Sequence, residues 1–184
     1  MDDTQSFEAF MLDHQNMVFG TAVRLLANRS EAEDIAQDVF LKAFHHFENL
    51  RDNPSAGGWL RTVVTNLCLN HLTRYRSRWN LFTEWRSSDG EELGPAAEMT
   101  APSDPLSEIA AAEQNELLEQ ALQKLPDSQR VPIVLFHLEN HSYEQIAAEL
   151  GISLGKVKTD IFRGREALRK VLQRKTGFSE IVRT

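Results

Sequence analysis

The chain has 184 residues, enough for one medium domain or two small ones, and a formal net charge of −7 at neutral pH. Its single cysteine, Cys68, excludes an internal disulfide, and no run of about 18 apolar residues predicts a membrane span. The acidic start of the sequence lacks the apolar stretch of a signal peptide. We therefore expect a cytoplasmic protein without membrane insertion.

Charge is distributed unevenly along the chain. Residues 51–83 carry five basic side chains and one acidic one, and residues 156–184 carry nine and three. Every other segment is acidic, and residues 84–130 carry eleven acidic and three basic side chains. A basic segment is often only a solvated helix face. Two such segments in an acidic chain also fit a protein that meets nucleic acid at two places.

Residues 5–50 show two helical patterns. Apolar residues recur at close to helical spacing over residues 5–27. Ser30, with Glu33 at the capping-box position, is predicted to begin a second helix. The apolar side of this helix is expected to include Phe44, and its opposite side is acidic.

A third helix follows a turn at residues 51–58, which contain Pro, Asn and Gly. We expect it to begin near Trp59 and to continue toward Leu72. Residues 86–105 are rich in Gly, Ser, Pro and acidic residues without an apolar period, so they predict a flexible acidic linker.

Helical periodicity resumes at Leu106 and continues to Leu125. Asp127 or Ser128 can cap the next helix, and Pro132 just inside it predicts a late start or a slight kink. No alternation typical of a strand appears. The sequence therefore predicts an all-α protein with two small helical domains, residues 1–85 and 106–175, joined by the linker 86–105 and followed by a tail at 176–184.

The stretch "YEQIAAELGISLGKVKTDIFRGREAL" has the pattern of a helix-turn-helix. Gly151 can take a positive φ after the first helix, Ile152 fills the turn, and Ser153 can cap the second helix. Ala147 is small enough for the two helices to cross closely. The buried stripe of the second helix is expected to comprise Val157, Ile161 and Leu168.

Donor side chains for phosphates or base edges are expected on the outer face of that helix, namely Lys156, Lys158, Thr159, Arg163 and Arg165. The acidic Asp160 lies among them and should repel a nearby phosphate. It is expected either to pair locally with Arg163 or Lys156, or to narrow the range of bases that the helix accepts. An ordinary helical hairpin with a basic solvated face is the alternative interpretation.

The stretch from Leu125 to Leu172 resembles the C-terminal domain of bacterial RNA polymerase sigma factors, most closely the extracytoplasmic-function (ECF) group. The resemblance implies that the second helix reads the −35 promoter element in the major groove. The residues implied in this contact are Lys156, Lys158, Thr159, Phe162, Arg163 and Arg165. Asp160 departs from the family, and Gly164 stands where the family often has Ala.

The stretch "SEAEDIAQDVFLKAFHHFENLRDNPSAGGWLRTVVTNLCLNHLTRYRSRW" resembles the sigma-factor domain that binds the polymerase β′ subunit and the −10 element. By resemblance, the β′ contact involves Asp34, Gln37, Asp38, Phe40 and Lys42. The residues implied at the melted −10 element are Trp59, Asn66, Asn70, Arg74, Tyr75, Arg76 and Arg78. Trp59 can also belong to the core, Asn66 can be a helix cap, and Asn70 stands where the family commonly has Asp.

The resemblance implies an initiation factor that binds core RNA polymerase through β′ and β, promoter DNA, and an anti-sigma factor. No catalytic, cofactor or metal motif appears in the sequence, so an enzyme is not expected. The acidic linker is expected to enter the active-site cleft of the polymerase. The rivals are a stand-alone helix-turn-helix regulator and a small helical hydrolase that uses His and Asp.

Overall fold

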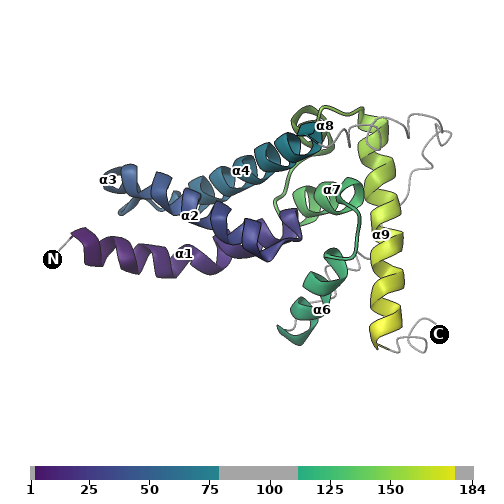
Figure 1. Cartoon of the computed structure of the whole chain (residues 1–184), viewed down its shortest axis with the longest axis horizontal. Coiled ribbons are helices and arrows are strands. Elements are labelled where there is room, and N and C mark those ends of the chain that lie inside the picture. Colours follow the sequence, from purple (N-terminus) through teal and green to yellow (C-terminus); the bar gives the residue numbers. More distant parts are fainter. Residues whose placement is uncertain (1–2, 79–111, 177–184) are drawn as a thin grey trace. The chain divides into compact units, whose positions relative to one another are not determined.

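Helices form all the regular structure of the described residues (Figure 1). The computed structural model describes residues 3–78 and 112–176, and their side chains over 6–74 and 116–174. These residues contain no strand, so the predicted all-α class is confirmed. The chain divides into two units, Met1–Leu81 and Phe82–Thr184. The predicted linker at 86–105 lies outside the described residues.

The N-terminal unit contains α1 (Asp3–Leu26), α2 (Arg29–His45), the short α3 (Phe47–Leu50) and α4 (Ala56–Arg78). Helices α1, α2 and α4 pack against one another (Figure 1). Their core includes the fully buried residues Val18, Leu25, Val39, Leu60 and Val64. Cys68 is also buried in this core, as a small apolar side chain would be.

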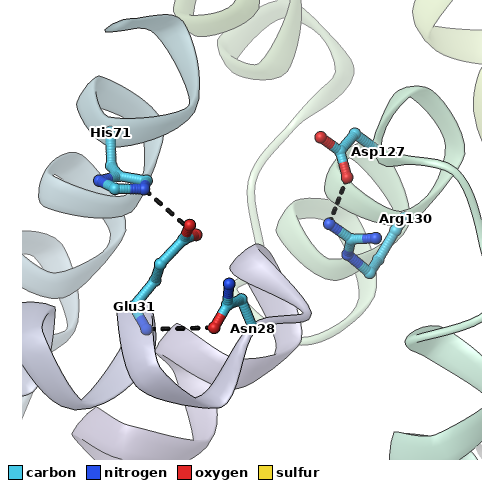
Figure 2. Close-up of polar contacts among 5 residues, drawn as sticks. All are labelled: Asn28, Glu31, His71, Asp127 and Arg130. Carbon is cyan, nitrogen blue, oxygen red and sulfur yellow. Dashed lines mark hydrogen bonds and ion pairs between the residues drawn. The ribbon is translucent and has the colours of Figure 1, made fainter. Parts of the chain in front are cut away.

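The start of α2 differs from the sequence prediction. Asn28 is the N-cap, and its Oδ1 accepts a hydrogen bond from the backbone N–H of Glu31 at 3.3 Å (Figure 2). The prediction that Ser30 caps this helix is wrong, because the helix has already begun at Arg29. The carboxylate of Glu31 lies 3.2 Å from Nε2 of His71, which links α2 to α4 (Figure 2).

The C-terminal unit contains α6 (Ala112–Leu122), α7 (Asp127–His137), α8 (Tyr143–Leu150) and α9 (Leu154–Thr176). The long helix α9 packs against α6, α7 and α8, and α7 also contacts α8. The core contains Leu122, Ile133, Leu135, Ile146 and Ile161, all almost completely buried.

Helix α7 begins earlier than expected, at Asp127, and its N-cap Pro126 provides no side-chain cap. The predictions of a side-chain cap at Asp127 or Ser128 and of a late start are therefore wrong, and Pro132 lies inside the helix. Asp127 instead pairs with the buried Arg130 (Figure 2). Nη1 of Arg130 also donates to the Leu125 carbonyl at 2.9 Å, which ties the start of α7 to the preceding turn.

Candidate nucleic-acid and protein interfaces

Helices α8 and α9 form the helix-turn-helix, and a serine caps the start of each helix. The N–H of Gln145 donates to Ser142 Oγ at 3.1 Å, and the Ser142 N–H donates to Gln145 Oε1 at 2.8 Å. Gly151 has φ of 64°, in the left-handed region, which turns the chain after α8. Ser153 Oγ then accepts from the N–H of Lys156 at 3.2 Å. The predicted Gly151 turn and Ser153 cap are confirmed, whereas the sequence reasoning missed the capping box on α8.

The inner side of α9 is closely packed. Val157, Ile161 and Leu168 are buried, as predicted. Gly164 faces α7, where an added Cβ would clash with Cδ1 of Ile133 and lie 3.2 Å from the carbonyl oxygen of Gln129. A glycine at this position therefore lets the backbone of α9 approach α7 closely.

The outer side of α9 carries Lys158, Phe162 and Arg163, which are all exposed. Phe162 is 44% exposed, so its ring is accessible from solvent beside these cations. Thr159 is half-buried, and its hydroxyl donates to the Gly155 carbonyl at 3.0 Å. The structure thus brings together an aromatic ring and two cations on one exposed helix surface, a composition suited to DNA.

Lys156 and Asp160 form an ion pair directed into the unit. Nζ of Lys156 lies 3.1 Å from Oδ2 of Asp160, and the two side chains are only 8% and 5% exposed. Burial raises the pKa of Asp160, and the adjacent Lys156 opposes this shift. The prediction that Lys156 lies on the outer face of α9 is wrong. Of the alternatives for Asp160, local pairing with Lys156 is the one observed.

Arg165 is half-buried at the edge of the same surface. Its Nε donates to Nε2 of His137 at 3.0 Å, and its guanidinium carbon lies 5.8 Å from the centre of the Phe136 ring. His137 and Phe136 were not predicted as part of this site. They are so far from Arg165 in the sequence that no local pattern indicates a contact among the three side chains.

Three of the residues predicted to bind the −10 element share one exposed face of α4. Asn66, Asn70 and Arg74 are spaced by four residues, which places them on one side of a helix, and all three are exposed. Trp59 is half-buried and its ring lies against His46, with 5.7 Å between centroids. The backbone of Tyr75, Arg76 and Arg78 continues α4, and their side chains lie outside the described residues.

The residues predicted to bind polymerase lie on α2. Asp34, Gln37, Asp38 and Lys42 are exposed and Phe40 is half-buried. Gln37 and Phe40 line a pocket of about 770 Å³ between α1 and α2.

Apolar side chains missing from that prediction extend the α2 surface. Leu41 and Phe44 also line the pocket and are 60% and 56% exposed. Phe44 was expected on the apolar side of α2; its ring and that of Phe7 form an edge-to-face pair with 5.0 Å between centroids, although Phe44 is more than half exposed. A helix with acidic, amide and uncovered apolar side chains has the mixed composition of a protein-binding face.

No helix within residues 3–78 or 112–176 is long and apolar enough to cross a membrane.

Two family models match the chain, one in each unit. The model "Sigma-70 region 2" matches residues 10–78, and "Sigma-70, region 4" matches residues 115–168. These matches cover α2, α4 and the part of α9 up to residue 168, which includes both predicted DNA-binding surfaces.

Relatives of known name match over nearly the whole chain. The RNA polymerase sigma-H factor of Pseudomonas aeruginosa is 32% identical over 93% of this chain and 88% of its own. The ECF RNA polymerase sigma factor SigW of Bacillus subtilis is 31% identical over 93% and 91%, respectively. A solved structure of the sigma factor RpoE in complex with the anti-sigma factor NepR, from Bartonella quintana, aligns with 26% identity and a TM-score of 0.49, covering 91% and 96% of the two chains. On the sequence matches, the chain belongs to the ECF group of the sigma-70 family of RNA polymerase sigma factors.

Proposed function

We propose that the chain is an initiation subunit that directs core RNA polymerase to a set of promoters and performs no chemistry itself. The observation that carries this proposal is the presence of a region 2 unit and a region 4 unit in one chain. A stand-alone regulator could use its first unit merely to dimerise, but it would not need a region 2 unit there.

In this proposal the N-terminal unit binds both polymerase and melted DNA. The face of α2, with Gln37, Phe40 and Leu41 at the pocket, docks on the β′ subunit. The face of α4 that carries Asn66, Asn70 and Arg74 meets the single-stranded −10 element. Asparagine supplies a donor and an acceptor for a base edge, and arginine supplies charge for the backbone.

The C-terminal unit places α9 in the major groove of the −35 element and contacts the polymerase β subunit. The exposed Lys158, Phe162 and Arg163 suit a groove that offers acceptors and thymine methyl groups. Because the whole chain is acidic, its affinity for DNA on its own is expected to be weak. Polymerase therefore brings the helix to the promoter.

Two further roles follow from membership of the ECF group. We propose that an anti-sigma protein binds the chain and withholds it from polymerase in the bacterial cytoplasm. We also propose that the acidic segment 86–105 enters the active-site cleft of polymerase, as its charge favours.

The decisive experiment adds the purified full chain to core RNA polymerase and a library of promoter DNA. Promoter-specific transcripts that depend on the chain are the expected result. Tight, sequence-specific duplex binding without core polymerase, together with no such transcripts, would instead support a stand-alone regulator.

A further inference from the structure

Two neighbouring side chains of α7 hold the guanidinium of Arg165. His137 accepts a hydrogen bond from its Nε at 3.0 Å, and the ring of Phe136 faces it at 5.8 Å. Phe136 is itself held by Tyr143, the first residue of α8, in a stacked pair with 4.6 Å between centroids. Three helices of the unit thus fix the position of one cation.

This cation lies beside the exposed surface of α9. Arg165 follows Lys158 by seven residues, close to two turns at about 3.6 residues per turn, so both lie on nearly the same side of the helix. Arg165 is half-buried whereas Lys158 and Phe162 are exposed. A cation at the edge of a groove-reading helix faces the DNA backbone, because the base edges lie at the centre of the groove.

The bond to His137 leaves Arg165 suited to a phosphate. It uses Nε, so it does not require the two amino groups at the end of the guanidinium, which can grip two oxygens of one phosphate. A side chain already fixed in place loses less conformational entropy when it binds. His137 can accept this hydrogen bond only through an unprotonated Nε2.

We propose that His137 is a positioning residue for DNA binding, which acts by holding Arg165 in the orientation that contacts a backbone phosphate of the −35 element. The guanidinium of Arg165 lies over the ring of Phe136, which supports the same orientation. The inference rests on the function proposed above and assigns a role to α7, a helix with no predicted DNA-binding residue.

The test uses holoenzyme assembled from core polymerase and the full chain. The DNA is a promoter fragment that wild-type holoenzyme has selected from a library with a randomised −35 region. His137→Ala should weaken binding about three- to tenfold, and by a similar factor on every selected sequence. In an Arg165→Ala background, the same substitution should have almost no further effect. Arg165→Ala should also lower the slope of log affinity against log salt by about 0.9, the value for one lost phosphate contact.

Arg169 is the matched control, since it lies on the same helix and pairs there with Glu166. In an Arg169→Ala background, His137→Ala should keep its full effect. His137→Gln retains an acceptor for Nε and should bind within about twofold of wild type, which a loss of mere packing would not predict. Phe136→Leu should give a smaller loss than His137→Ala.

Folding of each variant is checked by thermal melting. Binding to core polymerase, whose β′ contact is proposed to lie on the other unit, checks that the holoenzyme assembles. If His137→Ala does not fold, the binding of His137→Gln and Phe136→Leu to DNA tests the inference instead. A folded His137→Gln that binds as weakly as Arg165→Ala would overturn the inference. The inference would also be overturned if His137→Ala weakened DNA binding by its full factor in the Arg165→Ala background. If wild-type holoenzyme selects no promoter at all, the proposed function is contradicted, and this inference with it.

Discussion

The two units expose different kinds of side chain at their candidate interfaces. In the N-terminal unit, the most exposed large apolar residues are Leu12, Leu41 and Phe44, each more than half uncovered. Two of them line the pocket between α1 and α2. The apolar side chains of this α2 face are not fully covered by the rest of the unit. Such exposed apolar area favours a protein partner that covers it.

Helix α9 of the C-terminal unit is built differently. Of its four cations predicted to bind DNA, Lys156 and Arg165 are held by side chains of the same unit, whereas Lys158 and Arg163 extend to solvent. If the proposed roles hold, the α2 face binds protein through uncovered apolar area, whereas α9 binds DNA through charges whose positions are set by contacts within its unit. Five variants test how the two units build and hold these surfaces.

The largest effect is expected from Asp160→Ala. The substitution leaves the buried ammonium of Lys156 without its carboxylate partner, and should lower the free energy of unfolding by about 3 kcal/mol. Chemical denaturation measures this loss. The control Glu166→Ala removes a more exposed partner of Arg169 and should change stability by only a few tenths of a kcal/mol. Equal effects of the two variants would contradict an internal structural role for the Lys156–Asp160 pair.

The double variant Leu41→Ser and Phe44→Ser tests the apolar face of α2. We expect its affinity for core polymerase to fall by about 2.5 kcal/mol, because interface energy concentrates in a few apolar anchors. Titration of labelled chain with core polymerase gives this value. The control Leu154→Ser removes an exposed apolar residue of the unit that is proposed to contact β and not β′, and should lower the affinity much less. A loss of the same size in the control would break the contrast between the units.

Arg163→Ala tests whether the exposed cations read bases. A bidentate contact with a guanine predicts a loss of about 2 kcal/mol of discrimination at one base pair. Binding of variant holoenzyme to a set of single-base promoter changes measures it. A uniform loss across all promoters would instead assign Arg163 to a phosphate.

Gly164→Ala tests the close contact between α9 and α7. The clash with Cδ1 of Ile133 should cost about 2 kcal/mol, and the higher helix propensity of Ala should return about 1 kcal/mol of this. The net loss of stability is therefore about 1 kcal/mol. Ile133→Val removes the clashing methyl group, so the double variant should be more stable than the sum of the two single changes. If the two stability losses simply add in the double variant, Cδ1 of Ile133 is not the atom that limits the space at residue 164.

The smallest effect is expected from Asn28→Ala in the N-terminal unit. Loss of this cap should cost about 0.5–1 kcal/mol, toward the low end for a cap because the hydrogen bond is 3.3 Å long. Ser30→Ala, one residue into the helix, should cost less. Thermal melts of the two variants distinguish the observed cap from the one that the sequence suggested, and the opposite order of losses would restore Ser30 as the cap.

Features set by local sequence were predicted in part: the junction between α8 and α9 was, whereas the capping box on α8 and the start of α7 were not. The turn at Gly151 and the cap at Ser153 depend on neighbouring residues, and both are confirmed. The choice between Asn28 and Ser30 could not be made from sequence, because two capping residues stand close together and the end of α1 decides between them.

Contacts between helices account for what the sequence reasoning missed at the candidate site. Lys156 and Asp160 lie at the border between the buried and exposed sides of α9, where only the neighbouring helices determine the direction of a side chain. The bond between Arg165 and His137 spans 28 residues of sequence, so periodicity along one helix cannot reveal it. The roles of the DNA- and polymerase-binding residues themselves remain predictions.

The inward Lys156–Asp160 pair has a consequence for how such a factor can evolve. The residues that seat α9 in its unit are distinct from those that project from it, so changes at Lys158, Phe162 or Arg163 need not loosen the fold. We expect a duplicated copy of this chain to acquire new target sequences through a few substitutions on its outer surface. The same separation would let an engineer transplant the outer residues of a relative while keeping Lys156, Asp160 and Gly164 as the fixed frame.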